Sequence, residues 1–302
     1  MSETANDRRW TILELLNWTT GYFERAGIEN PRLNAEMLLA KVTGLPRIML
    51  YANFDRGVEA VQLEQFRDLV SRRRRRCPLQ YLLGECEFYG RTFEVNPSVM
   101  APRPETELVV DKCLEKIPGD GGGAWVADIG TGSGIIAVSL ACERPALRVA
   151  AVDVSEQALE IARRNAARNG AAERIKFLLG RLCEPLSGVM RAEGAAPALI
   201  VSNPPYIPSA EIESLEPEVR DYEPRQALDG GPDGLSVIRE LVPQAAEVLS
   251  PGGWLVLELG EGHAPRVKDM VAAGKTFDVA GVETVRDATD CERVLAVRKN
   301  RD

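Results

Sequence analysis

The sequence is poor in residues on which much enzyme chemistry depends, since it holds one histidine, His263, and six cysteines. A single histidine argues against a Ser-His-Asp triad, a Cys-His dyad or a histidine-rich metal centre. The cysteines are scattered without a metal-ligand spacing, so we expect reduced, mostly buried thiols rather than a disulfide scaffold. His263 follows an expected strand, and we favour a non-catalytic role for it. No metal site is expected, and the chemistry must rest on other groups.

Long apolar runs are missing as well. No uninterrupted apolar stretch approaches the roughly 20 residues that span a bilayer, so no membrane association is expected. Residues 1–9 are polar and charged, without the apolar core of a signal peptide. With 302 residues, of which 45% are apolar and 27% charged, the chain is typical of a globular protein with room for two domains. The expected location is the cytoplasm.

Basic charge is scarce outside the first part of the chain. The net charge is −8, yet residues 1–85 are slightly basic and the remainder is strongly acidic. An acidic remainder is a poor match for nucleic acid, whose backbone is bound by neutralising phosphates, so no direct nucleic-acid partner is expected. The exception is a run of five arginines at residues 72–76. This run fits either a solvated helix end or a docking patch for an acidic or RNA-containing partner.

A glycine-rich turn lies between an apolar stretch that starts at Trp125 and an apolar run at residues 135–140. The pattern predicts a strand, a tight turn and a helix, with glycines that let the backbone approach a ligand. Such a turn alone also fits dinucleotide binding, but Asp128 and the next strand narrow the choice. That strand ends in Asp153, roughly twenty residues past the last glycine, where a carboxylate can bind both ribose hydroxyls of an adenosine cofactor. The residues predicted to bind the cofactor in this turn are Gly130, Thr131, Gly132, Ser133 and Gly134.

The most informative stretch is Asn203, Pro204, Pro205 and Tyr206, after an apolar run at residues 198–201. It should lie at the carboxyl end of a buried strand, where open α/β sheets bind ligands. A planar NH₂ group is a poor nucleophile, but the Asn203 side-chain oxygen and a backbone carbonyl can each accept one of its hydrogens. The prolines fix φ and add no competing donor, and Tyr206 offers a flat face. An ordinary proline-rich turn is the other interpretation, and the glycine turn upstream counts against it.

The remaining pattern predicts three parts. Residues 1–85 show helical spacing and are interpreted as a small bundle that recognises a partner. Residues 86–100 contain a linking β-hairpin. Residues 101–302 alternate strands and helices, which indicates a doubly wound, mostly parallel α/β sheet, and their long loop at 207–233 is expected to be functional. Seven strands are expected, at residues 125–127, 148–153, 176–179, 198–202, 254–259, 276–285 and 293–298.

With these motifs in view, the chain resembles the protein-glutamine methyltransferases that modify peptide-chain release factors. The resemblance covers nearly the whole length, whereas Asn-Pro-Pro-Tyr alone is shared with adenine-N6 methyltransferases. It implies a Rossmann-like class I S-adenosylmethionine fold behind a helical substrate-recognition domain. It also implies a substrate, the glutamine of a Gly-Gly-Gln tripeptide in a release factor. The segments that carry it are residues 78–84, 102–107, 130–134, 203–206 and 223–228.

The resemblance implies a cofactor, S-adenosylmethionine, with its methionine part on the glycine turn and its ribose on Asp153. Asn203 is expected to border this cofactor site. Leu182 falls at the position that lines the adenine pocket, and the preceding Arg181 stands where the family usually has an acid. A further departure is Asp290, which replaces a usual glycine.

The same resemblance implies that Asn203 and the Pro204 carbonyl hold the substrate amide, with Pro205 and Tyr206 completing the slot. We expect in-line attack by the amide nitrogen, helped by alignment and by hydrogen bonds that strengthen as the nitrogen becomes cationic. No strong general base is required. The protein substrate is a release factor, and a monomer is expected.

Two alternatives remain at this point. An adenine-N6 methyltransferase acting on DNA or RNA needs the same NH₂ clamp, but it also needs a flipped base and a basic groove, and no such groove is evident. A cofactor-sensing module without catalysis predicts an altered Asn-Pro-Pro-Tyr slot, and this slot is intact.

Overall fold

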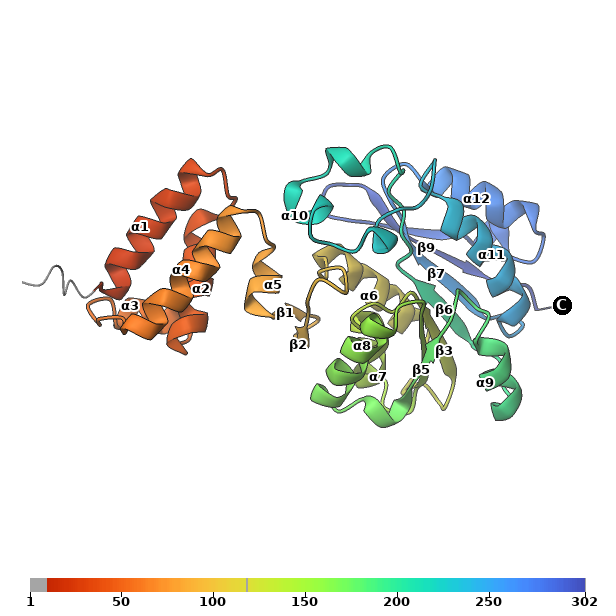
Figure 1. The fold of residues 1–302 in the computed structure, drawn as a ribbon. Coiled ribbons are helices and arrows are strands. Elements are labelled where there is room, and N and C mark those ends of the chain that lie inside the picture. The colour runs from red at the N-terminus through yellow and green to blue at the C-terminus, as the bar shows by residue number, and fades with distance from the viewer. Residues whose placement is uncertain (1–9, 118, 302) are drawn as a thin grey trace, which may run out of the picture. The chain divides into compact units, whose positions relative to one another are not determined.

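The computed structural model describes residues 10–117 and 119–301 and falls into two compact units (Figure 1). One unit comprises Met1–Gly84 together with Pro217–Tyr222, and the other comprises Glu85–Glu216 and Glu223–Asp302. We call them the helical unit and the catalytic unit. Residues 1–9, for which no signal peptide is expected, lie outside the described residues.

The helical unit contains the helices that the sequence predicts and three short ones that it does not. Thr11 begins the first with a capping box, in which its hydroxyl accepts from the Glu14 backbone and the Glu14 side chain returns the bond. Helices of four to six residues show too little of the helical period to be recognised, so α3, α5 and α10 were missed. The helices are α1 Ile12–Arg25, α2 Pro31–Thr43, α3 Arg47–Ala52, α4 Ala60–Arg74, α5 Leu79–Leu83 and α10 Pro217–Arg220.

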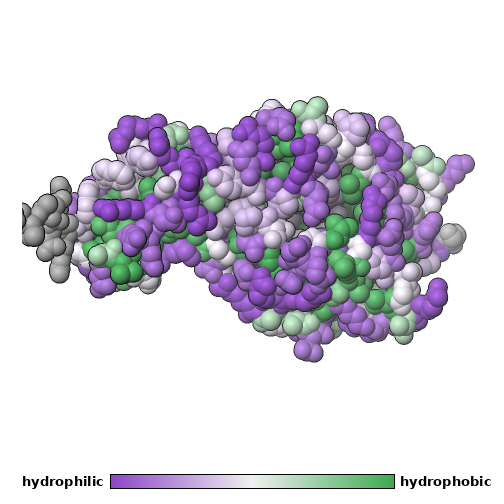
Figure 2. Space-filling view, in the orientation of Figure 1, coloured by the Kyte–Doolittle hydropathy of each residue, from purple (hydrophilic) through white to green (hydrophobic). Residues whose placement is uncertain are grey.

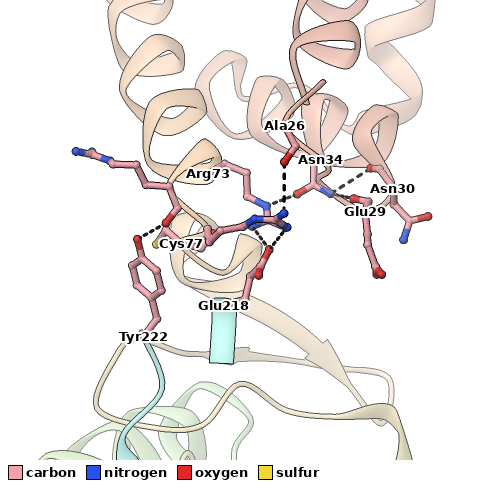
Figure 3. A network of polar contacts seen from close by, with 10 residues as sticks. Ala26, Glu29, Asn30, Asn34, Arg73, Cys77, Glu218 and Tyr222 are labelled. Atoms are coloured by element: carbon pink, nitrogen blue, oxygen red, sulfur yellow. Dashed lines mark hydrogen bonds and ion pairs between the residues drawn. The ribbon is translucent and has the colours of Figure 1, made fainter. Parts of the chain in front are cut away.

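The arginine run at the end of α4 is partly structural (Figure 3). Arg73 is buried and donates to Asn34 Oδ1 at 2.7 Å, to the Cys77 carbonyl at 3.2 Å and to Glu218 Oε1 at 3.0 Å. Arg76 donates to the same Glu218 oxygen at 3.1 Å. The interpretation as a solvated helix end is therefore wrong for Arg73, because a buried guanidinium is tolerated only with partners of this kind. Arg76 is partly buried, whereas Arg72, Arg74 and Arg75 are exposed.

The catalytic unit begins with an antiparallel hairpin, β1 Glu85–Phe88 and β2 Arg91–Glu94, that turns at Tyr89 and Gly90 with positive φ at both. Its main sheet has seven strands in the order β5-β4-β3-β6-β7-β9-β8. Strands β3 to β7 run parallel and β9 is antiparallel to both neighbours, which confirms the predicted doubly wound α/β class. The strands are β3 Trp125–Ile129, β4 Arg148–Asp153, β5 Ile175–Leu179, β6 Leu199–Ser202, β7 Trp254–Glu258, β8 Glu283–Arg286 and β9 Glu292–Arg298.

Helices cover both faces of this sheet, so its central strands are apolar on both sides (Figure 1). Trp125, Ala127 and Ile129 of β3 face one core cluster, which α11 and α12 complete. Val126, between them, faces the other cluster with α6 and α7, as the period of a strand requires. The helices of this unit are α6 Glu107–Lys116, α7 Ile135–Glu143, α8 Glu156–Arg168, α9 Leu186–Glu193, α11 Ser236–Val248 and α12 Ala264–Ala273.

One predicted strand is shorter than expected. Within residues 276–285 only the end belongs to β8, because residues 279–281 form a 3₁₀ turn that the Asp278 side chain caps at the Gly281 N–H. The loop at 207–233 is divided by short helical turns. The 3₁₀ segments are η1 Pro104–Thr106, η2 Ala172–Arg174, η3 Ile212–Ser214, η4 Arg225–Ala227 and η5 Val279–Gly281. Over the described ranges, no helix has both the length and the apolar character needed to cross a membrane.

Exposed large apolar side chains gather on the helical unit. Trp18 and Tyr51 are about half exposed, and Ile48 is 75% exposed. Figure 2 shows apolar side chains among the hydrophilic ones on the visible face of this unit. Exposed apolar groups that cluster in this way commonly mark a surface that meets a partner. The others of this kind on the helical unit are Leu13, Leu33, Met49, Phe54 and Val61.

Candidate active site

A cavity of about 270 Å³ lies where the carboxyl ends of β3, β4 and β6 meet. These ends come together because the strands are parallel neighbours, and this edge is where doubly wound sheets bind ligands. The cavity brings together most of the residues singled out from the sequence, although they are far apart along the chain. Those that line it are Gly130, Thr131, Gly132, Ser133, Asp153, Leu182, Asn203, Pro204 and Pro205. Gly134 and Tyr206 are not among the lining residues.

Two glycines of the glycine turn have different surroundings, open space at Gly132 and close packing at Gly134. Gly132 has φ +56°, and a side chain on it would meet no atom within 4 Å, so its space belongs to the cavity. Gly134 has φ +83°, and a Cβ there would lie 3.0 Å from the Ala162 Cβ on α8. Gly134 therefore allows α7 and α8 to pack closely, which is why it does not line the cavity.

Two carboxylates brace this turn. Asp128 is fully buried, and its Oδ2 accepts from the Thr131 hydroxyl at 2.6 Å and from the Ala137 N–H at 3.1 Å. Burial raises the pKa of Asp128 to about 7, against the effect of these hydrogen bonds. Asp153 accepts from the Gly132 N–H and the Ser155 N–H, both at 2.9 Å. Each Asp153 oxygen keeps a lone pair beyond these bonds, so the carboxylate can accept further donors from the cavity.

The wall beside Asp153 is apolar. Leu182 is buried with φ +48°, a left-handed conformation that holds its side chain at the cavity. Val154 is 55% exposed and lines the same wall. Arg181 also lines the cavity, but its guanidinium pairs with Glu240 at 2.7 Å. This end of the cavity therefore offers apolar contact to a flat ring rather than a carboxylate.

Asn203 directly follows β6, and its side chain is anchored at one end. Its Nδ2 donates to the Thr106 hydroxyl oxygen at 3.3 Å. Thr106 stands at the N-cap of α6 without capping it, is fully buried and lines the cavity. Among residues 10–117 and 119–301, no donor reaches Asn203 Oδ1. This amide oxygen is available as an acceptor, and the buried Pro204 follows it with a trans peptide.

Tyr206 does not line the cavity and is only partly buried. Its hydroxyl donates to Glu258 Oε1 at 3.4 Å, and its ring meets His263 edge to face with centroids 6.5 Å apart. Burial raises the pKa of Tyr206 and lowers that of His263. The sequence suggested that Tyr206 presents a flat face to the bound group, whereas the structure gives it polar contact with Glu258.

Sequence reasoning missed three residues near the cavity. Thr106 and Glu258 flank Asn203 and Tyr206, and Glu258 could have been noticed as a carboxylate that ends an apolar strand. Arg103 donates at 2.7 Å to Glu223, whose side chain is 1% exposed. This pair holds the 207–233 loop at Glu223, and the adjacent loop residues 224, 226 and 227 line the cavity.

The strand order and the cavity at the strand ends are those of a class I methyltransferase. Two family models match the chain, the PrmC N-terminal domain over residues 14–84 and the methyltransferase small domain over residues 106–215. The release factor glutamine methyltransferase of Geobacter sulfurreducens is 48% identical, covering 98% of this chain and 99% of the relative. That of Rhodopirellula baltica is 39% identical, covering 99% and 100%. The chain therefore belongs to the release factor glutamine methyltransferase family, which confirms the resemblance noted from its motifs.

A solved structure supports the fold alone. The catalytic domain of hMettl16, in complex with MAT2A 3′UTR hairpin 6, superposes with a TM-score of 0.55 at 14% identity. The match covers 78% of this chain and 82% of that one.

Proposed function

We propose that this protein transfers a methyl group from S-adenosylmethionine to the side-chain amide nitrogen of the glutamine in the Gly-Gly-Gln motif of a peptide-chain release factor. Membership of the family supports the reaction and the substrate. The proposal depends on one observation. The Asn203 side chain is held by its hydrogen bond to Thr106, its oxygen is free to accept, and it lines the same cavity as the glycine turn. A planar NH₂ group needs such an acceptor to be oriented.

The residues present fit the proposed cofactor. Because Gly132 has no side chain, the methionine part of S-adenosylmethionine can lie directly against its backbone. The Asp153 carboxylate has lone pairs left to accept hydrogen bonds from the two ribose hydroxyls. Leu182 and Val154 supply the apolar contact that an adenine ring needs. S-adenosylmethionine supplies an activated methyl group on a positively charged sulfur.

The chain's own contribution is alignment and charge stabilisation. Asn203 Oδ1 and the Pro204 carbonyl would each accept one amide hydrogen and so orient the substrate nitrogen for methyl transfer. Both hydrogen bonds strengthen as the nitrogen becomes cationic, so they stabilise the transition state more than the bound substrate. The product nitrogen is acidic enough to lose a proton to water. Pro205 completes the slot, and Tyr206 supports it from behind.

The helical unit is proposed to recognise the release factor, with residues 1–85 as the recognition domain, 86–100 as the linker and 101–302 as the methyltransferase domain. The exposed apolar side chains of the helical unit support this role. The acidic balance of the chain supports a protein substrate rather than nucleic acid. We expect a monomer that acts in the cytoplasm.

A methyl-transfer assay with three acceptors tests the function. Purified protein and labelled S-adenosylmethionine are incubated with a release factor, with free glutamine or with a DNA duplex. Label is expected on the release factor alone, and mass spectrometry should place it on the glutamine of Gly-Gly-Gln. Transfer to DNA, or to a release factor whose Gly-Gly-Gln is changed to Gly-Gly-Ala, refutes the proposal.

A further inference from the structure

One wall of the cavity comes from the loop at 207–233. Pro224, Gln226 and Ala227 line the cavity, and they belong to the 3₁₀ turn η4 or directly precede it. The Ala227 N–H closes this turn by donating to the Pro224 carbonyl at 2.8 Å. We call residues 224–227 the loop wall.

The loop wall is held on both sides. On one side, Arg103 donates to Glu223 Oε1 at 2.7 Å, and the Glu223 side chain is 1% exposed. On the other side, Ile207 donates its N–H to the Leu228 carbonyl at 3.0 Å and accepts from the Gly230 N–H at 2.8 Å. The position of the loop wall therefore depends on one buried ion pair and one pair of backbone hydrogen bonds.

Both anchors adjoin residues of the amide slot. Ile207 directly follows Tyr206 in the chain. Arg103 lies one turn from Thr106, whose N–H donates to the Arg103 carbonyl at 3.2 Å. The Thr106 hydroxyl oxygen in turn accepts from Asn203 Nδ2 at 3.3 Å. The loop wall therefore borders the slot in which the methyl-accepting amide is proposed to bind.

Gln226 is the residue of this wall that can form hydrogen bonds in the cavity, because the other two lining side chains are those of a proline and an alanine. It is exposed, and no other part of the described chain forms a hydrogen bond with its side-chain amide. A primary amide carries donors and an acceptor, so it can pair with both the C=O and the N–H of an extended peptide. Two glycines offer no side chain, so their backbone is the only part of them that can form hydrogen bonds.

We propose that Gln226 binds the backbone of the two glycines that precede the methyl-accepting glutamine, and that Arg103 and Glu223 are positioning residues that hold it there. The inference rests on the proposed function, because it assigns a part of that substrate to the loop wall. Among the residues that the structure describes, Arg103 is the only cation that pairs with Glu223. A carboxylate so deeply buried requires its cation, so loss of Arg103 should release the loop wall.

Steady-state kinetics with a release factor as the varied substrate test the role of Gln226. Gln226→Leu removes the donors and the acceptor at similar size, and we expect KM for the release factor to rise about tenfold, as for one lost hydrogen bond. The dissociation constant of S-adenosylhomocysteine, measured by calorimetry without turnover, should stay unchanged. Arg225→Gln is the matched control, because Arg225 lies on the same turn, is exposed and does not line the cavity. It should change neither quantity.

Hydrogen exchange in the free protein tests the ion pair without any substrate. The Ala227 and Leu228 N–H groups close the turn, so their exchange rates report whether the loop wall is held. Arg103→Met leaves the Glu223 carboxylate buried without its cation and should speed this exchange about tenfold or more. Arg103→Met/Glu223→Leu removes both charges and should restore slow exchange, and Gln226→Leu should leave it slow.

The two roles are linked, so their effects should not add. Arg103→Met should also raise KM for the release factor, and adding Gln226→Leu to it should raise KM no further. A Gln226→Leu variant with the KM of the wild type, or an Arg103→Met variant with unchanged exchange, overturns the inference and leaves the function standing. A wild type that methylates no release factor overturns the proposed function, and the assignment of Gln226 with it.

Discussion

Glu258→Gln is expected to make the protein more stable at alkaline pH. The pKa of Glu258 is about 7 in the fold against an ordinary 4.5, because its carboxyl group is buried. Between these values the unfolded chain has lost the proton that the folded chain keeps, so the folded state is destabilised as the pH rises. The difference between a pKa of about 7 and one of 4.5 corresponds to about 3 kcal/mol once the carboxyl group is ionised in both states. A glutamine at position 258 does not ionise, so the variant lacks this destabilisation at high pH.

Urea denaturation of the catalytic unit at pH 5 and pH 8 measures this effect. The free energy of unfolding of the variant, relative to the wild type, should rise by about 2–3 kcal/mol between the two pH values. Any fixed cost of packing a glutamine cancels in this comparison. Asp128, whose pKa is also raised by burial, is present in both proteins and cancels too. The exposed Glu261→Gln serves as the control. Parallel pH dependences of wild type and Glu258→Gln would show that Glu258 is ionised in the fold at no such cost.

Three further changes probe other parts of the molecule. Asn203→Ala should lower kcat about 10-fold to 100-fold and leave the S-adenosylmethionine dissociation constant from calorimetry nearly unchanged, and equal losses in both would contradict the clamp. Asp153→Ala should raise that dissociation constant about tenfold or more, whereas an unchanged value would remove its ribose role. Glu218→Gln leaves buried Arg73 without its anion and should lower the free energy of unfolding of the helical unit by about 1–3 kcal/mol in urea titrations, while the exposed Asp221→Asn should have little effect.

The parts of the fold that the sequence predicted are those whose signals are local. Strands β3, β4, β6 and β7 are short apolar runs bounded by turn residues, so period and composition suffice to place them. The 3₁₀ turn at residues 279–281 was missed because the Asp278 side chain caps it within a stretch of strand-like composition. The helix at residues 264–273 went unnoticed although Pro265 at its first turn is a start signal.

The parts of the site that the sequence predicted are also those with local signals. The glycine turn and the Asn-Pro-Pro-Tyr stretch each carry their chemistry within a few adjacent residues, and the structure brings most of them to one cavity. The structural role of Arg73 could not be predicted, because its ion-pair partner Glu218 is 145 residues away in the chain. Thr106 and Glu258 were missed for the same reason. A hydroxyl and a carboxylate have no distinctive spacing until folding places them behind Asn203.

The two acceptors of the slot are set by different means. The nitrogen of Pro205 carries no hydrogen, so the peptide after Pro204 can present only its carbonyl. The Asn203 amide carries both donor and acceptor, and Thr106 can also act as either, so neither decides which end faces the cavity. The proline acceptor therefore follows from the sequence alone, whereas the direction of the Asn203 amide depends on contacts that only the fold provides, its hydrogen bond to the buried Thr106 among them.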